Sequence, residues 1–561
     1  MEIPKEEHCS NRREFLARLP GTAAVVLAST TIPSANAAGT NLLDNSGANR
    51  IQASYAIREQ AARQDSNIPV PQQITNGDEQ TKGLKFIGNF SKGLPHDAFG
   101  QVDPNAYLAF LNAIRQGTAA AFEKVPLGGY GPDAVKLVNP LAGMAFDLEG
   151  LDSHQFAIPP SPSVTSRELA DEAVELYWMA LCRDINFTSY SSDPLTQAAA
   201  AELSSLQKFT GSKSGGRVIP QTLFRGFTAG DVIGPYVSQF LLRPFNYGPY
   251  ALSGTMNMYK AGVDYLTDQA SWLTCQNGQG PFFSNILEAV PRFTCTGRDL
   301  AVYVHNDPNA GLLISFYNAG IWLFGQNAPM NPGNPYTQYK TQAGFATFGV
   351  PHFLGLLGEA KQRACKAAWY LKWFVHRALR PEAYGGLVHM KKTHAQLDYP
   401  LDGEVLSSAA VDRVFRKNHS YFLPQAFPEG CPQHPSYPQG HATMAGACAT
   451  ILKAAFDGRV QFNTLSSGNI VTASANGRSL LAYTGGDAEQ ITVNGEIDKL
   501  ASNIGLARDF AGIHWRSDYE WGLRLGEAVA IGLLRDQSNN YAGEDFEGFE
   551  ITTFDGKTIT I

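Results

Sequence analysis

Long stretches of helical periodicity are the sequence feature that most restricts how this chain can fold. The longest, FLGLLGEAKQRACKAAWYLKWFVHRAL at 353–379, repeats apolar residues with the spacing of an amphipathic helix. A second stretch, 166–185, opens with Ser166 followed by acidic residues, an arrangement that caps the start of a helix. The same periodicity predicts helices at 104–116, 196–208, 311–325, 442–456 and 498–535. We therefore predict an all-α fold.

One region departs from this periodicity. Residues 457–497 contain three runs of β-forming residues, VQFNTL, NIVTAS and QITVNG, which Gly, Asn and Ser separate. We predict a small β-hairpin insertion near 457–497 within the helical bundles.

The length of the chain bears on its domain organisation. Its 561 residues exceed the roughly 250–300 at which a single core usually stops growing. Residues 38–80 are rich in Asn, Gln, Ser and Ala with little apolar periodicity, and predict a flexible leader. We assign 81–340 to an N-terminal helical region and 341–561 to a C-terminal helical bundle that carries the candidate site.

The first 37 residues have the layout of an export signal. Arg12 and Arg13 precede a short, mildly apolar stretch and the small-residue pattern Ala35-Asn36-Ala37. A surface helix with two arginines is the alternative. We predict a twin-arginine signal peptide at 1–37, cleaved after Ala37, and hence a bacterial protein delivered already folded to the periplasm or secreted.

Charge and hydropathy exclude two classes of partner. Charged residues make up 17% of the chain and the formal net charge is −7, whereas nucleic-acid binding needs a basic surface. Anionic membranes are disfavoured for the same reason. Beyond the N-terminus no run of apolar residues is long enough to span a membrane, so we predict no membrane span.

Six cysteines follow the predicted signal, and they show neither a CxxC pair nor zinc-ligand spacing. Cys275 and Cys295 could form a disulfide in an oxidising compartment. Buried free thiols are the alternative, and the sequence does not decide between them.

The candidate chemistry lies in three separate segments. In the first, Lys372, His376 and Arg380 are spaced by four residues, which predicts that they share one helix face. Pro381 then marks the predicted end of that helix. Taken alone, the segment could equally be a solvated basic face.

The second segment is CPQHPSYPQGHATMAGACATILKAAF, at 431–456. Gly440 allows a close approach of the backbone to a ligand, and a helix that starts near Ala442 directs its N–H groups and positive dipole end at the same place. His441 at that position is biased toward its neutral form, and His434 stands seven residues earlier. A helix cap with a chance histidine is the alternative.

The third segment, LARDFAGIHWRSDYEWG, holds Arg508, His514 and Asp518. On a helix, a carboxylate four residues after a histidine can accept its Nδ1–H and leave Nε2 free as a nucleophile or metal ligand. Arg508 lies six residues before His514, and Gly512 offers the break that lets both aim at one point. A salt-bridge cluster is the alternative.

Together the segments supply two arginines, a lysine, a helix N-terminus and two or three histidines from distant parts of a largely apolar chain. Such groups would repel one another unless a multiply charged oxyanion lay among them. We therefore predict a phosphate-like ligand.

This set resembles the three-part signature of vanadium-dependent haloperoxidases and type-2 phosphatidic acid phosphatases, which is Lys…Arg-Pro, Pro-Ser-Gly-His and Ser-Arg-x5-His-x3-Asp. Here it is written Lys372…Arg380-Pro381, Pro438-Gln439-Gly440-His441 and Ala507-Arg508…His514…Asp518. The eight-residue Lys-to-Arg interval and His434 resemble the red-algal and cyanobacterial bromoperoxidase branch. Further likeness at GLPHDAFGQVDPNAYLAFLNAI, GIHWRSD and FDGKTITI extends the resemblance over about 80–561. It implies helical bundles of the haloperoxidase and acid phosphatase type.

The resemblance also implies a cofactor and a role for each site residue. One vanadate per subunit would be bonded to Nε2 of His514, which Asp518 holds. His441 would manage the proton when hydrogen peroxide binds, and His434 would be an acid–base group or part of the halide pocket. The vanadate oxygens would accept hydrogen bonds from Lys372, Arg380, Arg508 and the Gly440 amide. Lys372 would also polarise the bound peroxide.

Two positions depart from the family pattern. Gln439 and Ala507 replace serines. Glutamine is longer and donates through its amide, so we include Gln439 among the vanadate contacts but expect weakened or altered turnover. Trp369, three residues before Lys372, resembles a tryptophan of fungal chloroperoxidases, although helix core is an equal alternative.

The resemblance predicts a vanadate-dependent haloperoxidase that oxidises bromide or iodide, with chloride also open, and releases hypohalous acid to halogenate small organic substrates. Two other functions stay open. One is an acid phosphatase in which His514 forms a phosphohistidine and His441 protonates the leaving group. The other is an oxyanion-binding homologue whose turnover Gln439 impairs. The resemblance further predicts a dimer-based homo-oligomer, up to a dodecamer, and leaves open a structural calcium or magnesium ion.

Overall fold

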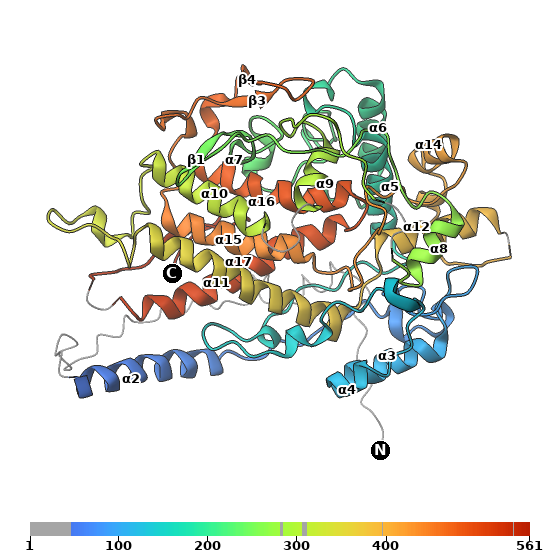
Figure 1. Cartoon of the computed structure of the whole chain (residues 1–561), viewed down its shortest axis with the longest axis horizontal. Coiled ribbons are helices and arrows are strands. Elements are labelled where there is room, and N and C mark those ends of the chain that lie inside the picture. The colour runs from blue at the N-terminus through green and yellow to red at the C-terminus, as the bar shows by residue number, and fades with distance from the viewer. Residues whose placement is uncertain (1–46, 281–283, 306–310, 395, 542–543) are drawn as a thin grey trace.

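The computed structural model describes residues 47–280, 284–305, 311–394, 396–541 and 544–561. Over these ranges the chain is dominated by helices, and the predicted all-α class is confirmed (Figure 1). The helices are α2 (Gly47–Ser66), α3 (Pro104–Gln116), α4 (Ala119–Phe122), α5 (Arg167–Cys182), α6 (Pro194–Ser205), α7 (Gln239–Leu242), α8 (Gln269–Gln276), α9 (Gly297–His305), α10 (Gly311–Gly325), α11 (Val350–Tyr370), α12 (Pro381–Thr393), α13 (Gly403–Leu406), α14 (Ala409–Asn418), α15 (Gly440–Ala455), α16 (Val493–Phe510) and α17 (Arg516–Ser538).

Helix α15 forms the centre of the fold and packs against α11, α16 and α17 (Figure 1). Small residues make the contact between α15 and α17 close. A Cβ built on Gly446 would overlap the carbonyl oxygen of Leu523, and one built on Gly526 would overlap that of Thr443. Only glycine lets the two backbones touch in this way, so the glycines fix how α15 and α17 lie against each other.

Further helices surround this centre. Helices α9 and α10 pack on α16 and α15, and α5 packs against α6, α13, α14 and α16. The largest hydrophobic cluster joins Trp178 and Trp322 with Leu452 and Leu533, so the predicted regions 81–340 and 341–561 share one core. No described helix is long and apolar enough to cross a lipid bilayer.

The stretch predicted as one helix at 353–379 changes geometry before its end. Helix α11 stops at Tyr370 and continues as a π-helical turn, Leu371–His376. Arg377 then takes a left-handed conformation with φ of 41°, which turns the chain. Pro381 begins α12 instead of ending a helix, as suits a residue with a fixed φ and no N–H to donate.

The stretch predicted as one helix at 498–535 is two helices. Helix α16 ends at Phe510 and α17 begins at Arg516, with Gly512 between them at φ 81°. The break predicted at Gly512 is therefore present, since glycine adopts this φ without strain.

The β-hairpin predicted within 457–497 is present, but only one of the three runs behaves as predicted. Strand β3 (Val471–Ala473), from NIVTAS, pairs antiparallel with β4 (Leu480–Ala482). VQFNTL forms no strand, and QITVNG runs into α16 because the Thr492 side chain caps that helix by accepting from Gly495 N. Two further hairpins, which we did not predict, are β1 (Phe245–Tyr247) with β2 (Tyr250–Leu252) and β5 (Glu550–Thr552) with β6 (Thr558–Thr560).

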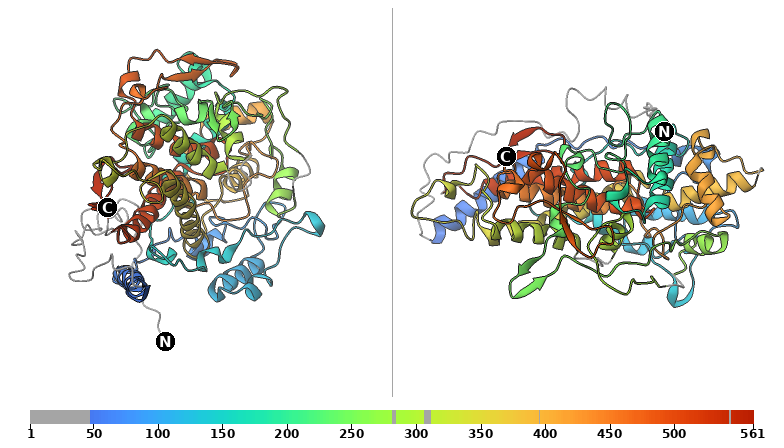
Figure 2. Two further views of the ribbon diagram at one scale, coloured as in Figure 1. Left: turned by 60° about the vertical axis from the view of Figure 1, so that its left-hand side comes forward. Right: turned by 90° about the horizontal axis from the view of Figure 1, so that it is seen from above.

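The predicted flexible leader, 38–80, contains helix α2, which stands apart from the bundle (Figure 1 and the left view of Figure 2). After it the chain returns to the body of the protein. Ile68 packs against the core, and the buried carboxylate of Asp78 accepts from the backbone N–H of Val164 at 2.8 Å. The sequence offered no apolar periodicity for this segment because α2 buries very little. The predicted signal, 1–37, lies outside the described residues.

The six described cysteines are free thiols, so of the two alternatives for Cys275 and Cys295 the structure shows the second. The Cys275 thiol donates to the carbonyl of Glu429 at 2.9 Å, and the Cys295 thiol lies 3.4 Å from Oδ2 of Asp299. Each thiol therefore has a polar partner inside the protein.

Candidate active site

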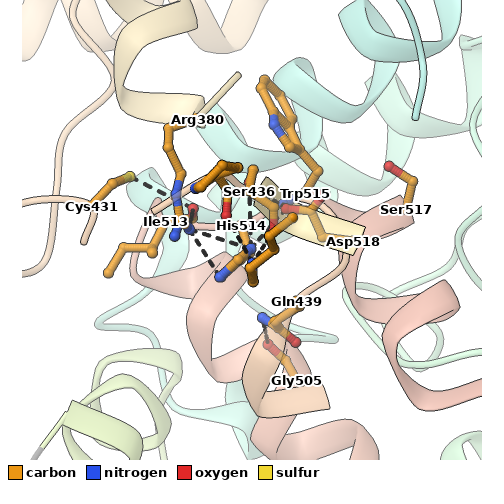
Figure 3. Close-up of polar contacts among 12 residues, drawn as sticks. Arg380, Cys431, Ser436, Gln439, Gly505, Ile513, His514, Trp515, Ser517 and Asp518 are labelled. Atoms are coloured by element: carbon orange, nitrogen blue, oxygen red, sulfur yellow. Dashed lines mark hydrogen bonds and ion pairs between the residues drawn. The ribbon is translucent and has the colours of Figure 1, made fainter. Parts of the chain in front are cut away.

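The three segments of basic and imidazole residues meet at one buried place, and Arg380 joins them. Its Nη1 lies 2.9 Å from Nε2 of His514, and its Nη2 lies 3.0 Å from Nδ1 of His434. It also donates to two backbone carbonyls, from Nε to His434 at 2.9 Å and from Nη1 to Ile513 at 3.0 Å. Figure 3 shows the guanidinium directly beside the His514 ring. The predicted convergence of the segments is therefore present.

Lys372 lies in the π-helical turn and is fully buried. Its ζ-amino group donates to the carbonyls of Pro435 at 2.8 Å and Ser436 at 2.6 Å. The predicted common helix face of Lys372, His376 and Arg380 is wrong, because the chain leaves α-helical geometry after Tyr370 and Arg380 stands at the start of α12. The turn nevertheless brings Lys372 to the loop before α15.

Gly440 is the first residue of α15, which therefore starts two residues earlier than the predicted Ala442. A Cβ at Gly440 would lie 3.0 Å from Cζ3 of Trp369, so a larger residue would press on the indole. The His441 ring is half-buried and hydrogen-bonds the backbone of Val304 in α9. The positive end of the α15 dipole thus opens beside Trp369 and Lys372.

His514 lies just before α17, and Asp518 lies in the first turn of that helix. Nδ1 of His514 is 2.7 Å from Oδ2 of Asp518, so the predicted contact is present. The same Oδ2 accepts from the backbone N–H of Trp515 at 3.2 Å. Because a carboxylate accepts and does not donate when ionised, this network assigns the proton to Nδ1 and the lone pair to Nε2.

Arg508 lies in the last turn of α16 and is 7% exposed. Its charge lowers the pKa of His434, His441 and His514, which places it within electrostatic reach of all three rings. The third segment therefore brings its three predicted residues, Arg508, His514 and Asp518, to the site.

Ser436 is a site residue that the sequence analysis missed. Its hydroxyl donates to Oδ2 of Asp518 and lies 3.4 Å from Nδ1 of His514. No spacing rule connects a serine between two prolines with a carboxylate 82 residues later in the chain. Only the folded structure reveals the contact.

Gln439 does not join the cluster through its side chain. The amide Nε2 donates to the carbonyl of Gly505 in α16 at 3.0 Å, and Figure 3 shows it directed away from Arg380 and His514. Its backbone N–H donates to the carbonyl of Asp518 at 3.0 Å. The prediction that the amide contacts the oxyanion therefore does not match this geometry. The physical reason is Gly505, which lacks a side chain and leaves room for the longer glutamine between α15 and α16.

Trp369 and His376, two aromatic residues close to Lys372 in the sequence, lie in different surroundings. Trp369 is half-buried, with its ring centre 4.8 Å from that of His434, and its Nε1 donates to Val138 O at 3.1 Å, so it faces the site. His376 instead lies in the core, edge-on to Tyr437 with 4.8 Å between ring centres. Neither of its ring nitrogens has a hydrogen-bond partner in the described part of the chain.

The electrostatics of the cluster reflect crowded positive charge. Burial, followed by the charge of Arg380, holds the pKa of Lys372 well below its usual value. Burial and the nearby basic side chains likewise lower the pKa of His514 far enough that the ring is neutral at neutral pH. Burial raises the pKa of Asp518 to about 6. An anion placed among Lys372, Arg380 and Arg508 would stabilise their charged forms.

The donor set fits an oxyanion of the vanadate or phosphate type. Ammonium and guanidinium groups and a helix N-terminus donate hydrogen bonds to oxygen, while Nε2 of His514 presents a lone pair to a central atom. In the described ranges no three His, Cys, Asp or Glu side chains gather as a cation-binding group. The fold and the site together define a helical oxyanion-binding protein of the class that haloperoxidases and type-2 phosphatases share.

Comparisons with known proteins narrow this class. Residues 352–541 match the family model described as the VCPO second helical-bundle domain. Vanadium-dependent bromoperoxidases of Ascophyllum nodosum and Corallina pilulifera are 35% and 34% identical to this chain; each match covers 91% of it, and 92% and 98% of the relatives. The solved homohexameric second vanadate-dependent bromoperoxidase of Ascophyllum nodosum superimposes with a TM-score of 0.84 at 30% identity, covering 91% of this chain and 90% of that one. The chain belongs to the vanadium-dependent bromoperoxidase family, and the predicted resemblance is confirmed.

Proposed function

We propose that this chain is a vanadate-dependent haloperoxidase that uses hydrogen peroxide to oxidise bromide or iodide to hypohalous acid. The observation that carries the proposal is the His514 ring, whose Nδ1 is held by Asp518 at 2.7 Å and whose Nε2 faces the guanidinium of Arg380 at 2.9 Å. A neutral imidazole whose Nε2 lone pair is free and which lies beside a cluster of cations is suited to bond the central atom of an oxyanion.

The residues that would hold vanadate come from all three segments. Nε2 of His514 would bond vanadium, and the oxygens would accept hydrogen bonds from Lys372, Arg380, Arg508 and the Gly440 amide. Bound there, vanadate supplies a Lewis acid at which hydrogen peroxide is activated without a change in the oxidation state of the metal.

The side chains around the cluster would orient the reactants and transfer protons. The neutral ring of His441, at the start of α15, can accept a proton from hydrogen peroxide as it binds. Hydrogen bonds to two carbonyls hold the ammonium of Lys372 in one position, from which it can donate to the oxyanion. The rings of His434 and Trp369, tilted by 39° with their centres 4.8 Å apart, form a wall along which halide can approach. Overall, one halide, one hydrogen peroxide and one proton give hypohalous acid and water, and the acid halogenates small organic molecules.

A dye-bromination assay tests the proposal. Apo-protein is incubated with orthovanadate, then given hydrogen peroxide and bromide, and a second sample without vanadate receives a phosphate ester. We expect vanadate-dependent bromination that His514→Ala lowers by at least about a hundredfold, and no ester hydrolysis. Ester hydrolysis alone would show an acid phosphatase, and vanadate binding with neither activity would show an impaired homologue. Metal analysis of the same sample measures calcium and magnesium.

The halide preference is part of the proposal. The bromoperoxidase relatives support bromide, and we include iodide with it; Trp369 at the site leaves chloride open. Comparing kcat/KM for the three halides at saturating vanadate decides, and a chloride value above that for bromide would contradict the preference.

The oligomeric state and the location are also proposals. We infer a homo-oligomer assembled from dimers, up to a dodecamer; one solved relative is homohexameric. Sedimentation of the purified protein measures the subunit number, and a monomer would contradict it. We further infer twin-arginine export to the periplasm or beyond, supported by Arg12-Arg13 and Ala35-Asn36-Ala37. Mass spectrometry of the mature protein should show a chain that begins at Ala38.

A further inference from the structure

We propose that Ser436 is a positioning residue that fixes the Asp518 carboxylate, and through it the His514 ring, for vanadate binding. The inference rests on the proposed function. Its basis is the hydrogen bond from the Ser436 hydroxyl to Oδ2 of Asp518, the same oxygen that accepts from Nδ1 of His514.

The Asp518 carboxylate depends on this hydroxyl for its orientation. Oδ2 accepts from Ser436, from His514 and from the N–H of Trp515, whereas Oδ1 has no hydrogen-bond partner in the described part of the chain. His514 and Trp515 belong to the same short segment as Asp518. Among the described residues, Ser436 is thus the donor that anchors this carboxylate to a different segment. Without it, the carboxylate and the imidazole can shift together.

Ser436 also connects two groups that would hold the same oxyanion. Its backbone N–H donates to the carbonyl of Ala378 at 3.1 Å, and its carbonyl accepts from Nζ of Lys372 at 2.6 Å. Its side chain meanwhile holds Asp518. The residue is fully buried. One residue therefore sets the distance between the Lys372 ammonium and the His514 ring.

Ser517, which directly precedes Asp518 in the chain, provides a matched control for Ser436. It is also a buried serine, 2% exposed, and its hydroxyl donates to Oε2 of Glu172 at 2.9 Å. Figure 3 shows Ser517 directed away from His514. Removing either hydroxyl breaks one buried serine–carboxylate bond, but only Ser436 touches the site.

The experiment measures orthovanadate affinity of the apo-protein by vanadium-51 NMR titration, in parallel with thermal unfolding. We expect Ser436→Ala to weaken vanadate binding by about ten- to a hundredfold, the range typical for partners that orient a metal ligand. Ser517→Ala should lower the unfolding temperature to a similar degree and leave vanadate affinity within about twofold of the parent. Ser436→Thr, which keeps the hydroxyl, should recover most of the affinity.

Two outcomes overturn the inference: parent-like vanadate affinity of folded Ser436→Ala, or an equal loss of affinity in Ser517→Ala. Should Ser436→Ala fail to fold, Ser436→Thr and Ser436→Val decide, since they have the same shape and differ in the hydroxyl; equal affinities sink the inference. The parent protein separates this result from the proposed function. A parent that binds no vanadate and brominates nothing refutes the function itself, whereas a normal parent with normal variants refutes only the role of Ser436.

Discussion

Nη1 of Arg380 lies 2.9 Å from Nε2 of His514 and 3.4 Å from Nδ1, so the guanidinium lies over the face of the ring, while Nδ1 is 2.7 Å from Oδ2 of Asp518. The imidazole is therefore held at Nδ1 by the carboxylate and contacted on its face by the guanidinium. The guanidinium marks a place from which an oxyanion oxygen would be hydrogen-bonded, because it lies within 2.9 Å of the atom that would bond vanadium.

This relationship predicts the effect of Arg380→Lys. A guanidinium can donate to His514, His434 and two carbonyls at once, whereas an ammonium lacks the planar fork. We expect vanadate affinity to fall by at least about tenfold, or about 1.4 kcal/mol. Titration of the apo-protein with vanadate measures it.

Arg377→Lys is the control for this change. Arg377 is equally basic and lies three residues earlier, but it pairs with Glu79, from Nε to Oε1 at 2.8 Å and from Nη2 to Oε2 at 2.6 Å. Its variant should lose stability and keep vanadate affinity. Vanadate affinity of Arg380→Lys equal to that of the parent would show that the guanidinium does not contribute to vanadate binding.

Gln439→Ser should raise the bromination rate severalfold at saturating vanadate. The serine hydroxyl at the start of α15 can face the oxyanion, whereas the Gln439 amide is bonded to Gly505 and contributes nothing there. Loss of that buried hydrogen bond should cost about 1–2 kcal/mol of stability. Rates of bromination and urea unfolding measure the two effects.

Gln239→Ser gives the comparison for Gln439→Ser. Gln239 is also fully buried, and its amide donates to the carbonyl of Val471 at 2.8 Å. Its variant should lose stability without any change in rate. Equal bromination by Gln439→Ser and the parent would show that glutamine at this position does not limit turnover.

The lowered pKa of the buried His376 leads us to expect that the stability of the protein falls as pH falls. Burial lowers the pKa of His376 to about 3, below the value of 6.5 that it has when unfolded. A histidine whose folded pKa is depressed contributes stability above pH 6.5 that is lost as pH falls, because only the unfolded chain then takes up the proton. Between pH 7.5 and pH 5 this loss amounts to about 2 kcal/mol.

His376→Phe should remove that contribution. The phenyl ring can keep the edge-on contact with Tyr437, and neither nitrogen of the histidine has a described partner to lose. Urea unfolding at both pH values should show the parent weakening by about 2 kcal/mol more than the variant. Identical pH dependence of the two proteins would mean that His376 takes up a proton in the folded state.

Arg516→Met should destabilise the protein by about 3–5 kcal/mol, since it leaves a buried carboxylate without its counter-charge. Arg516 opens α17 and binds Glu175 of α5 through two nitrogens, at 2.7 Å and 2.5 Å. Adding Glu175→Leu should recover much of the loss, which thermal unfolding of the single and double variants measures. A double variant no more stable than Arg516→Met would argue against the pairing.

Sequence patterns predicted the regular helices well where one face is apolar and the caps are conventional. The bounds of α3 and α10 agree with the predicted 104–116 and 311–325, and Asp103 with Pro104 shows why α3 starts where it does. The three segments of the site were also found from spacing, since Gly440, His514 and Asp518 act through local geometry.

What the sequence could not provide depends on contacts between distant segments. The π-helical turn places Lys372 against the loop before α15, and no periodicity distinguishes such a turn from an α-helix. The direction of Gln439 follows from the space at Gly505, and the role of Ser436 follows from Asp518. These are consequences of packing, which a single sequence does not reveal.

The glycine contacts between α15 and α17 have a mechanical consequence. With their backbones touching at Gly446 and Gly526, the two helices cannot slide or rotate past each other. The Gly440 amide and the Asp518 carboxylate, at the starts of these helices, therefore form an immobile half of the site. An oxyanion that binds there therefore meets a fixed spacing between these two groups, in addition to the Lys372 ammonium that two carbonyls hold.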